Sequence, residues 1–151
     1  MLKSEQVDRE TKLSGGSKER YPIDRIDILL AAMRIFSKEG RDEVSFSEFQ
    51  ESIAEFQREF PSLGYAFAER FLLSLDLLTD LSNLDYRGYI RDYHCRLDAL
   101  LPKRFLSLTA LGRGQGNKIL QTITDDVVDS LTRAVKISIK NYNERWRLWA
   151  R

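Results

Sequence analysis

The sequence predicts a mainly α-helical fold that carries a small antiparallel β-hairpin and ends in a long C-terminal helix. Three observations predict it. Apolar residues recur at helical spacing through most of residues 24–80, and two short segments after residue 84 alternate between apolar and polar residues. The segment 125–151 then repeats an apolar position about every 3.5 residues. With 151 residues, 42% of them hydrophobic, the chain can fill the core of one domain.

The first half of the chain predicts three helices and one short extended piece. The apolar spacing indicates a helix over 24–38, and an extended piece over 44–46 follows it. Ser47 is the expected N-cap of a second amphipathic helix. Ser62 is the expected N-cap of a third helix, which its apolar residues extend from about 63 to 80.

The second half predicts a hairpin followed by two helices. Alternation indicates strands over 84–91 and 104–109, and Thr109 is the expected N-cap of a glycine-weakened helix. The order helix, short strand, helix, helix, two strands is typical of a winged helix-turn-helix domain. We therefore expect a polar flexible tail over 1–22, a winged-helix domain over 23–123 and a C-terminal dimerisation helix over 124–151.

Charge and composition narrow the classes of function. The net charge is only +1, but residues 81–120 carry seven basic and three acidic side chains, so an anionic partner is expected there. No apolar run is long enough to span a bilayer, and the N-terminus lacks the apolar segment of a signal peptide. One cysteine, Cys95, permits neither an internal disulfide nor a cysteine-based zinc cluster. We expect a cytoplasmic protein that does not bind membranes.

The segment Lys103-Arg104-Phe105-Leu106-Ser107-Leu108-Thr109-Ala110-Leu111-Gly112-Arg113 resembles the end of the wing in PadR-type transcriptional regulators. In that family a basic strand with an aromatic residue runs into Leu-Thr, two further residues and Gly-Arg. The resemblance implies a winged-helix repressor that binds duplex DNA as a homodimer. Compact members that act on the cyanobacterial circadian clock are similar in size and layout, which implies a clock-gene promoter as target. The Gly-Tyr signature of the family's second helix is missing here.

The candidate DNA-binding residues fall into two groups. The hairpin offers basic side chains that could reach phosphates or enter a groove: Arg87, Arg91, Arg96, Lys103 and Arg104. The predicted third helix offers side chains for base edges: Ser62, Tyr65 and Arg70. An ordinary solvated surface is the alternative for both groups.

The apolar stripe of the last helix is the candidate dimer interface. Its members follow a coiled-coil spacing: Val128, Leu131, Val135, Ile139, Tyr142, Trp146 and Trp149. The helix is long for a domain of this size, which favours pairing with a second copy over packing on its own domain.

We expect no enzyme activity, cofactor or metal site. A single histidine stands beside the single cysteine, and the glycine-rich segment 112–118 lacks the Gly-Lys-Ser/Thr ending of a phosphate loop. A small-molecule effector is left open. The main alternative function is a winged-helix protein–protein interaction module that does not bind DNA.

Overall fold

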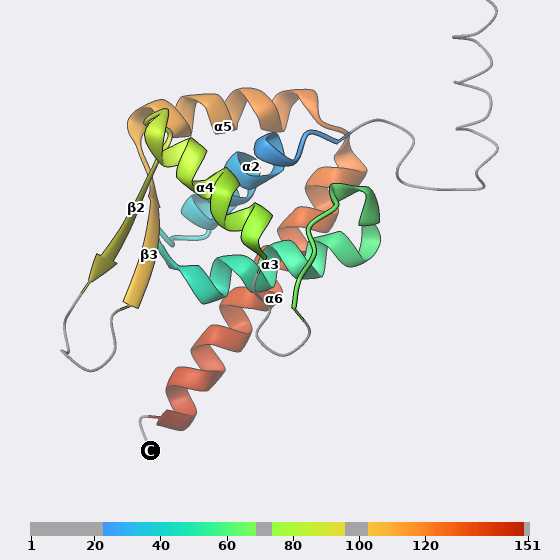
Figure 1. The fold of residues 1–151 in the computed structure, drawn as a ribbon. Helices are drawn as coiled ribbons and strands as arrows, with labels where there is room; N and C mark the ends of the chain where they lie inside the picture. Colours follow the sequence, from blue (N-terminus) through green and yellow to red (C-terminus); the bar gives the residue numbers. More distant parts are fainter. Residues whose placement is uncertain (1–22, 69–73, 96–102, 150–151) are drawn as a thin grey trace, which may run out of the picture.

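The computed structural model describes residues 23–68, 74–95 and 103–149. It is mainly helical, with a small antiparallel sheet and a long C-terminal helix (Figure 1). The elements are α2 (Arg25–Lys38), β1 (Glu43–Ser45), α3 (Phe46–Glu59), the 3-10 turn η1 (Pro61–Leu63), α4 (Leu75–Tyr86), β2 (Ile90–Cys95), β3 (Lys103–Leu108), α5 (Ala110–Thr122) and α6 (Asp125–Trp149). The predicted tail over 1–22 lies outside the described residues.

The sheet has three strands in the order β1-β3-β2, and both pairings are antiparallel. The predicted hairpin is present as β2 and β3. The short piece before α3 joins it as β1, with Val44 opposite Leu106. One inward-facing residue from each strand is buried, and the three close the core on this side: Val44, Ile90 and Leu106.

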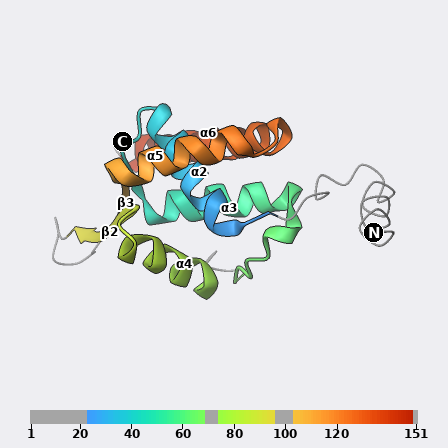
Figure 2. The same cartoon turned by 90° about the horizontal axis from the view of Figure 1, so that it is seen from above.

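Helix α2 forms the centre of the domain. Its residues from Ile28 to Met33 are all buried, as are Ile35 and Phe36. Side chains of α3 and α4 pack around it: Phe49, Ile53 and Phe56 from α3, and Leu77, Leu81 and Leu84 from α4. Seen from above, α4 lies on one side of α2, while α5 and α6 lie on the opposite side (Figure 2).

The predicted third helix over 63–80 is wrong in position. A 3-10 turn ends at Gly64, whose φ of 81° is left-handed, and the chain is non-helical as far as 68. The amide side chain of Gln57 accepts a hydrogen bond from the N–H of Tyr65 and donates one to its C=O. These two backbone groups are therefore not used in the hydrogen bonds of a helix. Helix α4 begins after the N-cap Ser74, so the α3–α4 connection is longer than the ~3–4 residues of a usual helix-turn-helix turn.

The first predicted strand, over 84–91, is also displaced. Leu84 continues the buried face that Leu77 and Leu81 form on α4, so residues 84–86 stay helical. Gly88, with a φ of 83°, turns the chain, and β2 starts at Ile90. Alternation over so few residues did not distinguish the last turn of a helix from a strand.

Helix α5 starts at the predicted N-cap, where the Thr109 hydroxyl accepts the N–H of Gly112 at 3.0 Å. The same hydroxyl donates to the carbonyl of Gly88, at the base of the hairpin. Gly112 and Gly116 are buried, because α5 passes close to the turn before β2 and to α2. These two glycines thus allow close packing of the helix.

Helix α6 runs antiparallel to α3 along most of its length. Ser130 and Arg133 bond Glu59 near the end of α3, whereas Asn141 and Arg145 bond Glu51 nearer its start. The last turns of α6 project beyond the rest of the domain (Figure 1). No helix within the described ranges combines the length and the apolarity that crossing a membrane requires.

Candidate nucleic-acid interface

The exposed basic side chains of the candidate interface lie where α4 leads into the hairpin. Arg87 is the C-cap of α4, and its N–H bonds the carbonyl of Asn83. Arg91 lies on β2 opposite Ser107. Both arginines are exposed, and neither forms an ion pair with another residue of the described ranges. These two predicted side chains are therefore available to an anionic partner.

Arg104 forms contacts within its own domain that the sequence does not predict. Its Nε lies 2.7 Å from Asp92 Oδ1, and its Nη2 forms an ion pair with Asp92 Oδ2. The guanidinium also covers the ring of Phe46, 4.5 Å from the centroid. The hydrogen bond to Asp92 raises the pKa of Arg104. Arg104 therefore has a structural role, in which it joins the two strands to α3, and its contact with a phosphate stays a prediction.

Three other predicted residues fall partly or wholly outside the described structure. Arg70 and Arg96 lie outside the described residues. The backbone of Lys103 opens β3 opposite Cys95, but its side chain is outside the described part. Their contact with DNA stays a prediction.

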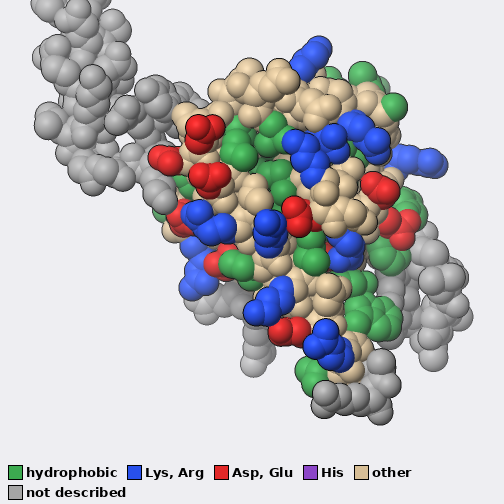
Figure 3. Space-filling view, turned by 180° about the vertical axis from the view of Figure 1, so that it is seen from behind, with side chains coloured by type: hydrophobic (Ala, Val, Ile, Leu, Met, Phe, Trp, Pro, Cys, Tyr) green, Lys and Arg blue, Asp and Glu red, His purple; other side chains and the backbone are tan. Residues whose placement is uncertain are grey.

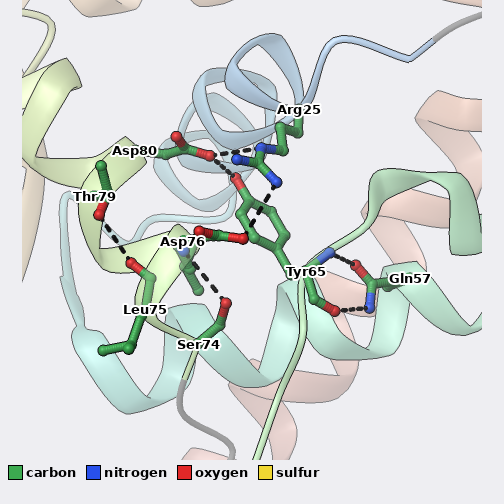
Figure 4. A network of polar contacts seen from close by, with 9 residues as sticks. Arg25, Gln57, Tyr65, Ser74, Leu75, Asp76, Thr79 and Asp80 are labelled. Carbon is green, nitrogen blue, oxygen red and sulfur yellow. Dashed lines mark hydrogen bonds and ion pairs between the residues drawn. The ribbon is translucent and has the colours of Figure 1, made fainter.

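Tyr65 belongs to a buried polar network instead of a base-reading surface. Its side chain is only 4% exposed, and its hydroxyl donates to Asp80 Oδ2 at 2.6 Å (Figure 4). Arg25 Nε lies 2.9 Å from the same carboxylate oxygen, and its guanidinium covers the Tyr65 ring. Burial, followed by the hydrogen bond to Asp80, raises the pKa of Tyr65 far above its ordinary value. The burial of Tyr65 contradicts its predicted contact with a base edge.

Ser62 is exposed, but it lies in η1, before the non-helical segment, and not on a recognition helix. The exposed helix face next to the hairpin belongs to α4 instead. Its members at helical spacing are Leu75, Thr79, Ser82 and Tyr86, flanked by Asp76, Asn83 and Asp85. The N-cap Ser74, followed by apolar residues at 77, 81 and 84, is the sequence signal that could have placed this helix.

The residues of the predicted dimer stripe on α6 differ in burial: some are buried in their own domain and others are exposed. Leu131 and Val135 are completely buried in the core of their own domain, so their assignment to an exposed interface is wrong. Ile139 is partly buried against the same core, and Val128 is half-buried. The sequence predicted that the last helix is too long to pack on its own domain, but α3 is long enough to cover this part of α6.

The distal part of the stripe is more open. Tyr142 is half-buried beneath the guanidinium of Arg41, 4.9 Å from the ring centroid. Trp146 packs edge-on against Tyr142 and remains 49% exposed, and Leu148 is 67% exposed. The side chain of Trp149 lies outside the described residues.

Basic side chains also line the outer face of α6, on the side of the domain opposite α4 (Figures 2 and 3). Lys136, Lys140 and Arg147 surround a shallow groove there, together with Glu39 and Glu144. Within the described ranges, no three His, Cys, Asp or Glu side chains are grouped so that they could hold a metal ion.

No family model matches this chain, and no curated protein matches it closely enough to count as a relative. The likeness to PadR-type regulators thus stays a prediction that rests on residues 103–113.

Proposed function

We propose that this chain is a winged-helix transcriptional regulator that binds duplex DNA as a homodimer. The observation that carries the proposal is the topology. A helix, a short strand and two helices precede the β2–β3 hairpin, and β1 adds to the sheet beside β3. This is the element order of a winged helix-turn-helix, in which a helix and the adjoining hairpin face DNA together. The proposed action is occlusion of a promoter without chemistry. Repression and a clock-gene target stay predictions from the resemblance.

Charge supports the hairpin as part of the DNA-binding surface. Residues 87–108 include five basic and two acidic side chains, and Arg87 and Arg91 are exposed. Arginine on an exposed hairpin suits contact with phosphates, which dominate affinity for DNA.

The end of α6 supports self-association. Large apolar side chains remain exposed along it: Ile137 at 42%, Trp146 at 49% and Leu148 at 67%. Large apolar side chains that stay exposed on a helix suit an interface between two copies. We expect sedimentation to show a dimer at micromolar concentration and Leu148→Asp to shift it toward monomer without loss of helical circular dichroism. A wild-type monomer under these conditions would contradict the homodimer.

The DNA proposal is tested by gel shift with a pool of random duplexes at low and moderate salt. Binding that weakens by roughly 10³-fold or more between about 50 and 200 mM salt would indicate several phosphate contacts. Absence of a shift on every duplex would contradict the proposal.

A protein–protein interaction module is the second candidate, and the surface of α4 favours it. Leu75 is 74% exposed and Tyr86 is 93% exposed, with Asp76 and Asp85 on either side and no basic residue on the helix. Such a face fits a partner with apolar and basic side chains. If no duplex is bound, this candidate takes precedence.

A further inference from the structure

The charges of α4 oppose a close approach to phosphate groups. The helix contains Asp76, Asp80 and Asp85 and no lysine or arginine. Asp80 is neutralised by Arg25, but Asp76 is exposed with only a long 3.9 Å approach to Arg25, and Asp85 is exposed without an ion pair in the described ranges. A helix that lies in the major groove has a phosphate backbone on each side, so exposed carboxylates there are unfavourable.

The hairpin presents the opposite charge. In an antiparallel pair, residues directly opposite each other share a face, so Arg91 and Tyr93 lie on the same outer face as Ser107 and Phe105. Arg91 is exposed, and Tyr93 and Phe105 are partly exposed, with their ring centroids 6.1 Å apart. The one carboxylate of β1 on this face, Glu43, accepts a hydrogen bond from the Tyr93 hydroxyl.

The inner face of the hairpin holds that outer face in place. The ion pair between Arg104 and Asp92 joins the strands, the Arg104 guanidinium packs on Phe46, and Leu106 is buried in the core. At the base, the Thr109 hydroxyl bonds the carbonyls of Gly88 and Tyr89. Arg91 therefore projects from a strand whose position is fixed by several tertiary contacts.

We infer that the β2–β3 hairpin, and not α4, makes the principal contact with the duplex. This inference rests on the proposed function. The major groove, ~12 Å wide, admits a two-stranded ribbon, and arginine pairs bidentately with guanine O6 and N7 there. Arg91 is the residue that reads the base, Arg87 contacts a flanking phosphate, and α4 stays outside the groove.

The test measures the affinity of the full-length protein for a duplex that it selects from a random pool, at two or more salt concentrations. Arg91→Ala is expected to weaken binding about tenfold or more and to remove protection of guanine N7 from methylation. Arg87→Ala is expected to lower the salt slope by about one. Ser82→Ala combined with Asn83→Ala, two exposed positions of α4, is expected to leave the affinity unchanged, and Asp85→Asn is expected to strengthen binding. Lys136→Ala, on the opposite face, is the matched control.

Each outcome discriminates. Loss of affinity in the Ser82/Asn83 variant, with Arg91→Ala unaffected, overturns the inference and leaves the proposed function standing. Methylation protection confined to adenine N3, in the minor groove, also overturns it. Failure of the wild-type chain to bind any duplex overturns both. Circular dichroism and unfolding of each variant show whether a loss of DNA affinity comes from a lost contact or from a protein that no longer folds.

Discussion

Gly112 lies directly against the carbonyl group of Tyr89: a Cβ at this glycine would stand 1.9 Å from the Tyr89 oxygen and 2.8 Å from its carbon. Both contacts are with backbone atoms, which cannot turn away as a side chain can. The first turn of α5 is thereby held against the turn that enters the hairpin. The Leu-Thr-x-x-Gly-Arg segment thus has a packing role at Thr109 and Gly112, where it joins α5 to the base of the hairpin.

Gly112→Ala is expected to destabilise the protein by about 3 kcal/mol or more, because the added methyl group requires the helix or the turn to shift. Gly114→Ala is the matched control, since nothing lies within 4 Å of a Cβ there. This control is expected to gain up to ~1 kcal/mol from helix propensity. Urea unfolding of both variants measures the difference, and equal stability of the two variants would contradict the packing role.

Arg104→Ala is expected to lower the free energy of unfolding by about 1–3 kcal/mol, because it leaves the Asp92 carboxylate, 7% exposed, without its partner. A double-mutant cycle with Asp92→Ala measures the coupling, expected to be about 0.5–3 kcal/mol. If Arg104→Ala unfolds like the wild type yet binds DNA more weakly, the structural role is wrong and the predicted phosphate contact is supported.

Tyr65→Phe is expected to cost about 1–2 kcal/mol near neutral pH, because Asp80 loses the hydroxyl donor and retains only Arg25. The folded state raises the pKa of Tyr65 above its ordinary value near 10.0, so the unfolded chain releases this proton first. The stability that this proton confers is complete below that value and declines as the pH rises beyond it.

Unfolding at about pH 8 and about pH 11 checks this sign. The wild type is expected to lose more stability over this interval than Tyr65→Phe, which lacks the ionisable group. An equal loss in both proteins would show that Tyr65 ionises in the folded state as readily as in the unfolded chain.

Glu48 is fully buried, accepts a hydrogen bond from Arg41 Nη2 at 2.7 Å through one oxygen, and has no partner for the other among the described residues. Burial raises its pKa above the ordinary 4.5, although Arg41 and Ser45 oppose the shift. The stability that the protonated Glu48 side chain confers is therefore complete below pH 4.5 and declines as the pH rises through the folded-state pKa.

Glu48→Gln removes this dependence. The stability of the wild type relative to Glu48→Gln is expected to be greatest in acid and to fall toward neutral pH. Parallel urea titrations across that range measure the difference. A relative stability that rises with pH would mean that Arg41 outweighs burial at this site.

The sequence alone predicts a mainly helical fold, the position of β3, the cap at Thr109 and the long last helix. These features depend on apolar spacing and on capping side chains, which act within a few residues of each other. Arg87 and Arg91 are exposed, as their place in a predicted turn and strand suggests, and their contact with DNA stays a prediction.

The tertiary structure was needed to show which side chains are exposed and which are buried or paired. Tyr65 meets Asp80, Arg104 meets Asp92, and Val44 pairs with Leu106. It also decided that α6 packs on α3 and that α4, not the residues before it, is the helix beside the hairpin. Burial and ion pairing depend on segments far apart in the chain, and the spacing of residues along one segment carries no information about the segment that will cover it.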